Sequence, residues 1–202
     1  PLPANAMWQL WLPSDMERFV AEADATADSV LAAMDRCAET SWMMNMGSAK
    51  GILIEKVIAQ RRPKRLLEIG TFLGYMSIRL ARSMPVDSTL TTIEIDADNY
   101  AASRRIRAKA LGKRDDSVIA LKANASEALK SLKGPFDFVL MDHWKPDYAR
   151  DLEALRTKGL LADKCMVVAD NVLVPGAPEL LDYLNVPYVP ANDAVSGQAC
   201  LQ

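Results

Sequence analysis

The sequence is poor in the residues that build thiolate and histidine metal sites. It has three cysteines, Cys37, Cys165 and Cys200, which lie far apart without a C-x-x-C spacing, and one histidine, His143. An odd and scattered cysteine count argues against a disulfide framework and against a thiolate zinc site. One histidine excludes a site with several imidazole ligands. We therefore expect a reducing compartment.

Long apolar runs and an excess of charge are also missing. No run approaches the ~20 apolar residues that cross a bilayer, and the start does not resemble a signal peptide. Lys and Arg number 24 against 26 Asp and Glu, a net charge of −2, which offers no attraction to nucleic acid or an anionic membrane. We expect a cytoplasmic protein with no nucleic-acid partner and no membrane segment in this chain. Because the chain opens with Pro1 rather than Met, an anchor or extra domain upstream stays open.

What is present indicates one domain. The chain has 202 residues, half of them apolar, enough for a single sizeable core. The first residues hold two Pro-flanked tryptophans, Trp8 and Trp11. We predict an N-terminal arm over residues 1–14 and a single domain over residues 15–202.

Short apolar segments alternate with helical ones along most of the chain. Helices are predicted at residues 15–40, 48–60, 75–84, 97–111, 125–132, 147–157 and 177–184, and strands at 65–69, 89–94, 118–121, 136–141 and 165–169. Such alternation is typical of βαβ units and a parallel sheet that is buried on both faces. The predicted fold class is therefore α/β: a Rossmann-like, doubly wound, mostly parallel sheet flanked by helices. Residues 195–200 are a candidate for a short antiparallel last strand.

Carboxylates stand at the carboxyl ends of four predicted strands. Glu68, Glu94, Asp142 and Asp170 occupy these positions. Ligands of open doubly wound sheets bind at this edge. Four acidic residues on one edge exceed what folding requires, so we expect the functional site there.

The turn after the first strand carries a Gly70-x-x-x-Gly74 spacing. It is neither the G-x-G-x-x-G dinucleotide motif nor a Walker-A loop. Glu94 follows Gly70 by 24 residues, where an acidic residue accepts hydrogen bonds from ribose hydroxyls. A tight strand-to-helix turn and a solvated acid are the alternative interpretations. Together the two features favour a nucleoside ligand without a pyrophosphate.

Three oxygen-bearing side chains follow the last two predicted strands. Asp142, Asp170 and Asn171 suit a hard, six-coordinate Mg²⁺ ion with positions left open for substrate. The alternative is a polar turn after a strand. Lys145 lies three residues past Asp142, and a lysine near a cation is shifted toward its neutral, basic form. The alternative is a solvated loop lysine.

A cluster of large apolar residues precedes the second predicted helix. It consists of Trp42, Met43, Met44 and Met46. These side chains form either a stripe of the core or an apolar lid for an aromatic substrate and a methyl-sulfonium group.

Taken together, these segments closely resemble the catechol O-methyltransferase family. Order and spacing agree from about residue 30 to residue 184. Two motifs, Asp142–Lys145 and Ala169–Val172 followed by Pro175–Pro178, are specific enough to separate the chain from the plant caffeoyl-CoA type. The matching segments are Trp42–Lys50, Leu67–Tyr75, Thr92–Ile95, Met141–Lys145, Ala169–Val172 and Pro175–Pro178.

The resemblance implies a class I enzyme that transfers a methyl group from S-adenosylmethionine to one hydroxyl of a catechol, with Mg²⁺ bound. Lys145 would be the general base and Asp142, Asp170 and Asn171 the metal ligands. The implied cofactor-binding residues are Met46, Glu68, Gly70, Gly74, Tyr75, Glu94, Ile95, Ala125, Ser126, Asp142, His143 and Trp144. The implied substrate-binding residues are Trp42, Met44, Trp144, Lys145, Asn171 and Pro175. The partner would be a small catechol or related phenol, and the protein a monomer or weak dimer.

Three positions depart from the family. Met76 stands where the family has a serine that touches the cofactor, with Ser77 next to it, and the register of Asn124–Ser126 against the family's Ser-Gln is open. No Glu follows Glu179 to bind the second catechol hydroxyl. This leaves two alternatives: a different phenol or vicinal diol as acceptor, or a non-catalytic scaffold that binds S-adenosylmethionine.

Overall fold

The computed structural model describes residues 13–40 and 45–186. Its centre is a five-stranded sheet in the order β3-β2-β1-β4-β5, with every neighbouring pair parallel. The strands are β1 (Arg65–Ile69), β2 (Thr89–Glu94), β3 (Val118–Lys122), β4 (Phe136–Met141) and β5 (Leu161–Ala169). The predicted doubly wound parallel sheet is confirmed, whereas the candidate last strand at residues 195–200 and most of the predicted arm lie outside the described residues.

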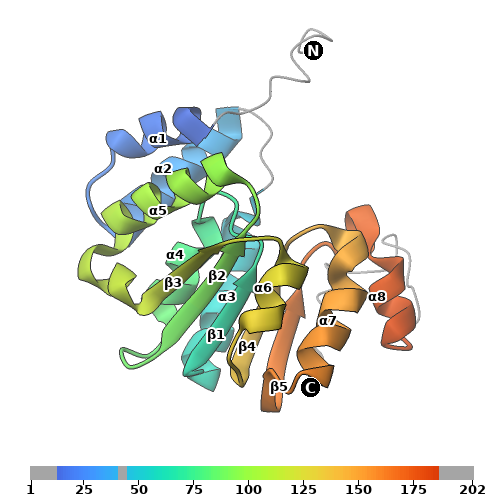
Figure 1. The fold of residues 1–202 in the computed structure, drawn as a ribbon. Coiled ribbons are helices and arrows are strands. Elements are labelled where there is room, and N and C mark those ends of the chain that lie inside the picture. The colour runs from blue at the N-terminus through green and yellow to red at the C-terminus, as the bar shows by residue number, and fades with distance from the viewer. Residues whose placement is uncertain (1–12, 41–44, 187–202) are drawn as a thin grey trace, which may run out of the picture.

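Helices cover both faces of the sheet (Figure 1). The first face carries α1 (Pro13–Ala21), α2 (Ala27–Thr40), α3 (Gly47–Arg61), α4 (Tyr75–Ser83) and α5 (Ala97–Leu111). The second carries α6 (Ala125–Ser131), α7 (Tyr148–Thr157) and α8 (Pro178–Tyr183). Successive strand residues alternate between the two cores: Leu66 packs with the first group of helices and Leu67 with the second. Both faces of the sheet are therefore buried.

Two predicted boundaries were wrong. The single helix expected at residues 15–40 is two helices, because polar side chains cap the start of α2: the Ser29 N–H donates to Thr26 Oγ1 (3.2 Å) and the Asp24 N–H to Ser29 Oγ (2.9 Å). β5 begins at Leu161, opposite Phe136, rather than at residue 165. Polar residues in its first half hid this part of the strand.

The chain reverses its winding direction between β1 and β4. The segment after β1 forms a helix on one face of the sheet and the segment after β4 a helix on the other. In open parallel sheets, ligands bind outside the strand ends at such a reversal point. At this place Gly70 has φ +97°, and a Cβ there would lie 2.4 Å from the Asp142 carbonyl oxygen. Gly70 thus brings the ends of β1 and β4 together.

None of the helices in the described part of the chain is long and apolar enough to cross a membrane.

Candidate active site

The ends of β4 and β5 place two carboxylates side by side. The register pairs Met141 with Ala169, so Asp142 and Asp170 are the next residues on adjacent strands, as predicted. The Asp170 N–H donates to the Met141 carbonyl (2.9 Å). Behind them, the buried Tyr148 hydroxyl from α7 lies 2.8 Å from the Met141 carbonyl oxygen and 3.2 Å from that of Asp170. The two strand ends are therefore held together from the α7 side.

Lys145 joins this pair through Asp142. Its Nζ donates to Asp142 Oδ1 over 2.8 Å and lies 5.3 Å from the centre of the Tyr148 ring. Burial raises the pKa of the Asp142 carboxyl, the Lys145 ammonium lowers it, and the negative charge of Asp170 raises it again. The two carboxylates thus influence each other electrostatically, and the predicted base is in contact with one of them.

A second lysine, Lys50, reaches the site from α3. Its Nζ donates to Asp170 Oδ1 over 2.6 Å, and the same oxygen accepts the Asn171 N–H over 2.8 Å. Lys50 was not among the predicted site residues, although it lies within a segment that matches the family. A separation of 120 residues from Asp170 left no local signal for this contact.

Ion pairs with α4 fix the position of α3. Glu55 accepts hydrogen bonds from Arg79 (3.0 Å) and from Arg82. The Arg79 guanidinium lies against Gly51, where a Cβ would approach it to 2.5 Å. This close packing sets the first turn of α3, and with it Met46 and Lys50, at the carboxyl edge of the sheet.

Glu94 stands at the end of β2 with its carboxylate held by the backbone. The Phe72 N–H donates to Oε2 (2.7 Å) and the Asp96 N–H to Oε1 (2.9 Å), while burial raises the pKa of the group. A carboxylate can accept about four hydrogen bonds. Each Glu94 oxygen therefore retains acceptor capacity suited to the hydroxyls of a ribose.

Glu68 lies deeper, at the end of β1, and is fully buried. Ser77 and Thr92 hydroxyls donate to its Oε2, whereas Oε1 is buried without a hydrogen-bond partner among the described residues. Burial raises the pKa of this carboxyl to about 7, against the opposing effect of the hydroxyl donors. An unpartnered buried acceptor below the glycine turn fits a ligand that brings a donor, such as the amino group of a methionine moiety.

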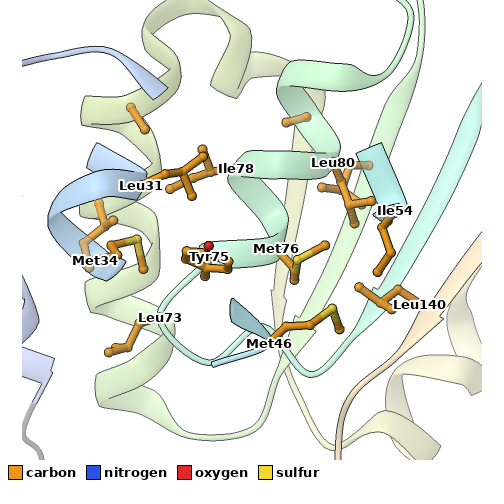
Figure 2. Close-up of a cluster of buried hydrophobic side chains, with 14 of the residues drawn as sticks. Leu31, Met34, Met46, Ile54, Leu73, Tyr75, Met76, Ile78, Leu80 and Leu140 are labelled. Carbon is orange, nitrogen blue, oxygen red and sulfur yellow. The ribbon is translucent and has the colours of Figure 1, made fainter. Parts of the chain in front are cut away.

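The turn itself divides its residues between the site and the core. Gly70 and Gly74 both have positive φ, and Gly74 begins α4. Tyr75 points into the core: its hydroxyl donates to Asp35 Oδ1 (2.8 Å) and accepts from Arg79 (2.8 Å). Figure 2 shows Tyr75 and its neighbour Met76 within the same apolar cluster. The Tyr75 side chain therefore belongs to the core, and only the backbone of this residue lies at the turn. Met76 is a core residue as well.

The residues predicted around an adenine ring lie on three separate loops. Ile95 and Trp144 are exposed, at 65% and 71%. His143 faces α7, with Nε2 3.0 Å from Asp151 Oδ2. Ala125 and Ser126 open α6, where the Ser126 N–H donates to Asn124 Oδ1 over 2.9 Å. All of them follow the carboxyl ends of strands of the sheet.

The predicted substrate wall is described only in part. Pro175 lies in the short helix Val172–Gly176. This helix begins directly after Asn171, whose φ is +59°. Trp42 and Met44 lie outside the described residues. Met46 is buried in the core cluster (Figure 2), which agrees with the core interpretation for this residue.

The residues that could hold a metal ion are two carboxylates and one amide, Asp142, Asp170 and Asn171. Within residues 13–40 and 45–186, no group of three or more His, Cys, Asp or Glu side chains could hold an ion. The oxygen-only donor set of this trio nevertheless fits a hard divalent cation, and both of its carboxylates are paired with cationic side chains.

The sheet order and the acidic carboxyl edge define the class: a Rossmann-like methyltransferase fold. Among solved structures, the O-methyltransferase TomG of Streptomyces achromogenes, in complex with SAM, is similar with a TM-score of 0.69 and 25% identity, covering 87% of this chain and 83% of that one. A family model described as O-methyltransferase matches residues 22–182. The chain belongs to this O-methyltransferase family.

Curated relatives support the same assignment. The catechol O-methyltransferase of Mus musculus is 39% identical over 162 residues, which are 77% of this chain and 60% of that protein. A probable O-methyltransferase of Mycobacterium tuberculosis is 36% identical over 167 residues, covering 78% and 70%. The matched region is about 60% of the length of the catechol O-methyltransferases of Mus musculus, Danio rerio and Bos taurus.

Proposed function

We propose that the protein transfers a methyl group from S-adenosylmethionine to one hydroxyl of a catechol-type substrate, with Mg²⁺ bound by Asp142, Asp170 and Asn171. The observation that carries the proposal is the contact of Lys145 with Asp142, 2.8 Å, beside Asp170 at the adjacent strand end. Relatives named catechol O-methyltransferase support the substrate class.

Each part of the edge has a defined task in this reaction. When bound, Mg²⁺ would favour the phenolate form of a chelated hydroxyl. Lys145 Nζ, in contact with the metal ligand Asp142, is the group placed to take the hydroxyl proton as general base. Glu94 accepts hydrogen bonds from the ribose hydroxyls. Glu68 Oε1 accepts a hydrogen bond from the amino group of the methionine moiety. Holding both reactants at one edge lowers the activation free energy by several kcal/mol, up to about 7–11 kcal/mol.

The acceptor can also be a different phenol or vicinal diol. This second candidate follows from residues 180–202, among which there is no Glu that could bind the second hydroxyl of a catechol. Both candidates share the cofactor, the metal ligands and the base, and they differ in the acceptor that gives the highest kcat/KM.

The test is methyl transfer from labelled S-adenosylmethionine to dihydroxybenzoate and to a monophenol, with Mg²⁺ and with EDTA. We expect Mg²⁺-dependent product that Lys145→Met lowers by about 10²–10⁴-fold. Lys158→Met, an exposed lysine beyond α7, is the matched control and retains the rate. Product formed equally in EDTA, or full activity of Lys145→Met, contradicts the mechanism. Cofactor binding by calorimetry without turnover of any acceptor supports the scaffold instead.

A further inference from the structure

Lys50 contacts one of the two carboxylate oxygens of Asp170, a ligand of the proposed magnesium site. Asp170 is 8% exposed, and its Oδ1 accepts two donors, the Lys50 ammonium at 2.6 Å and the Asn171 N–H at 2.8 Å. A third, cationic partner can approach this oxygen only by displacing one of the two. The Asn171 N–H belongs to the adjacent peptide and stays in place, so Lys50 is the donor that can leave.

The charges at this edge balance without a divalent ion. Asp142 is paired with Lys145, and Asp170 with Lys50. Both ammonium groups also act electrostatically on Asp142. A divalent cation between the carboxylates would therefore enter beside two positive charges, and like charges at such distances disfavour binding.

The two lysines differ in their freedom to move. The Lys145 side chain is 17% exposed, lies against the Tyr148 ring and is three residues from its partner. The Lys50 side chain is 39% exposed and comes from a different element. Its four-carbon stem can turn toward solvent without a change of the α3 backbone.

We infer that Lys50 is the counter-ion that Asp170 holds before the metal binds, and that it competes with the divalent cation for Asp170 Oδ1. Lys50 thereby weakens metal binding, and entry of the ion releases the first turn of α3 from β5. This inference rests on the proposed magnesium site and adds to it a residue, outside the ligand set, that determines its affinity.

The test uses the full chain and Mn²⁺ as a paramagnetic probe of the divalent site, titrated by electron paramagnetic resonance. Lys50→Gln and Lys50→Met, which keeps the unbranched stem, are expected to bind Mn²⁺ at least about tenfold more tightly. Without metal both variants should melt at a lower temperature than the unmodified chain, because the two carboxylates then repel each other. Lys50→Arg should restore both values. The melting curves of Lys50→Gln and Lys50→Met also show whether each variant remains folded.

Matched controls separate failure of the inference from failure of the proposed function. Lys56→Gln removes an exposed charge from the same helix and should leave the Mn²⁺ affinity within about twofold. If the unmodified chain does not bind Mn²⁺, or if Asp170→Asn binds it equally well, the magnesium site itself is wrong. If the chain binds Mn²⁺ through Asp170 but the Lys50 variants bind it equally or more weakly, the competition is overturned.

Discussion

The two halves of the carboxyl edge hold their carboxylates in different ways. At the ends of β4 and β5, Asp142 and Asp170 are paired with flexible lysine side chains. At the ends of β1 and β2, Glu68 and Glu94 are held by hydroxyls and backbone N–H groups. Lysine ammonium groups can be exchanged for another cation, whereas neutral donors leave a fixed acceptor for a neutral or cationic ligand. The first half is thus suited to a metal ion and the second to the polar groups of a nucleoside.

The largest effect should come from Gly70, where the two halves meet. Gly70→Ala places a Cβ 2.4 Å from the Asp142 carbonyl oxygen at φ +97°, so the ends of β1 and β4 must separate. We expect the free energy of unfolding to fall by about 4 kcal/mol or more, measured by urea denaturation. Gly159→Ala is the matched control: its φ is +64° but nothing lies within 4 Å of the added Cβ, so only the backbone cost of about 1–2 kcal/mol applies. Equal losses in the two variants would show that the contact does not matter.

Glu68 provides the next largest effect, as a dependence of stability on pH. Burial raises its pKa from 4.5 to about 7, so between these values the folded chain retains a proton that the unfolded chain has lost. The free energy of unfolding therefore decreases as the pH rises through this window, by up to about 3 kcal/mol. Glu68→Gln removes this titration, and its stability relative to the unmodified chain should rise from pH 5 to pH 8.

Urea denaturation at four pH values between 5 and 8 checks this expectation. Glu127→Gln, on the exposed side of α6, serves as the control and should differ from the unmodified chain by a constant amount. A constant difference for Glu68→Gln as well would mean that the buried carboxylate is charged throughout the range.

The smallest effect concerns ligand binding alone. Glu94→Gln replaces a carboxylate oxygen with an amide nitrogen that faces a backbone N–H, and weakens the hydrogen bonds offered to a ribose. We expect the affinity for S-adenosylmethionine, measured by calorimetry, to fall by about 10- to 100-fold, with Mn²⁺ affinity retained. Asp170→Asn should do the reverse. Loss of both affinities in either variant would show that the two halves do not act separately.

Local sequence patterns were sufficient to predict most of the fold and part of the site. Apolar runs predicted all five strands, and the acidic residues at the ends of four of them indicated which edge carries the site. The break before α2 was missed because it depends on side-chain caps at Thr26 and Ser29 rather than on Gly or Pro. β5 was predicted too short because Asp163 and Lys164 interrupt its apolar run.

Contacts between distant segments could not be predicted in this way. The role of Gly70 in the approach of β1 to β4, and that of Lys50 at Asp170, both depend on how the crossovers place separate elements. The orientation of Tyr75 is a similar case: its position in the motif suggested a cofactor contact, whereas its hydroxyl binds Asp35 on α2. Sequence spacing identifies which residues reach an edge but not which way each side chain turns.

The Tyr148 hydroxyl, between the carbonyl oxygens of Met141 and Asp170, has a consequence for ion size. It sets the distance between the peptides next to both acidic ligands of the proposed magnesium site. Mg²⁺ prefers oxygen ligands at about 2.0–2.1 Å and Ca²⁺ at about 2.3–2.6 Å. A change of a few tenths of an ångström in the distance between the two ligands would therefore favour one ion over the other. We therefore expect the preference of the proposed site between the two ions to depend on this phenol of α7, which lies behind the strands and is not itself a ligand.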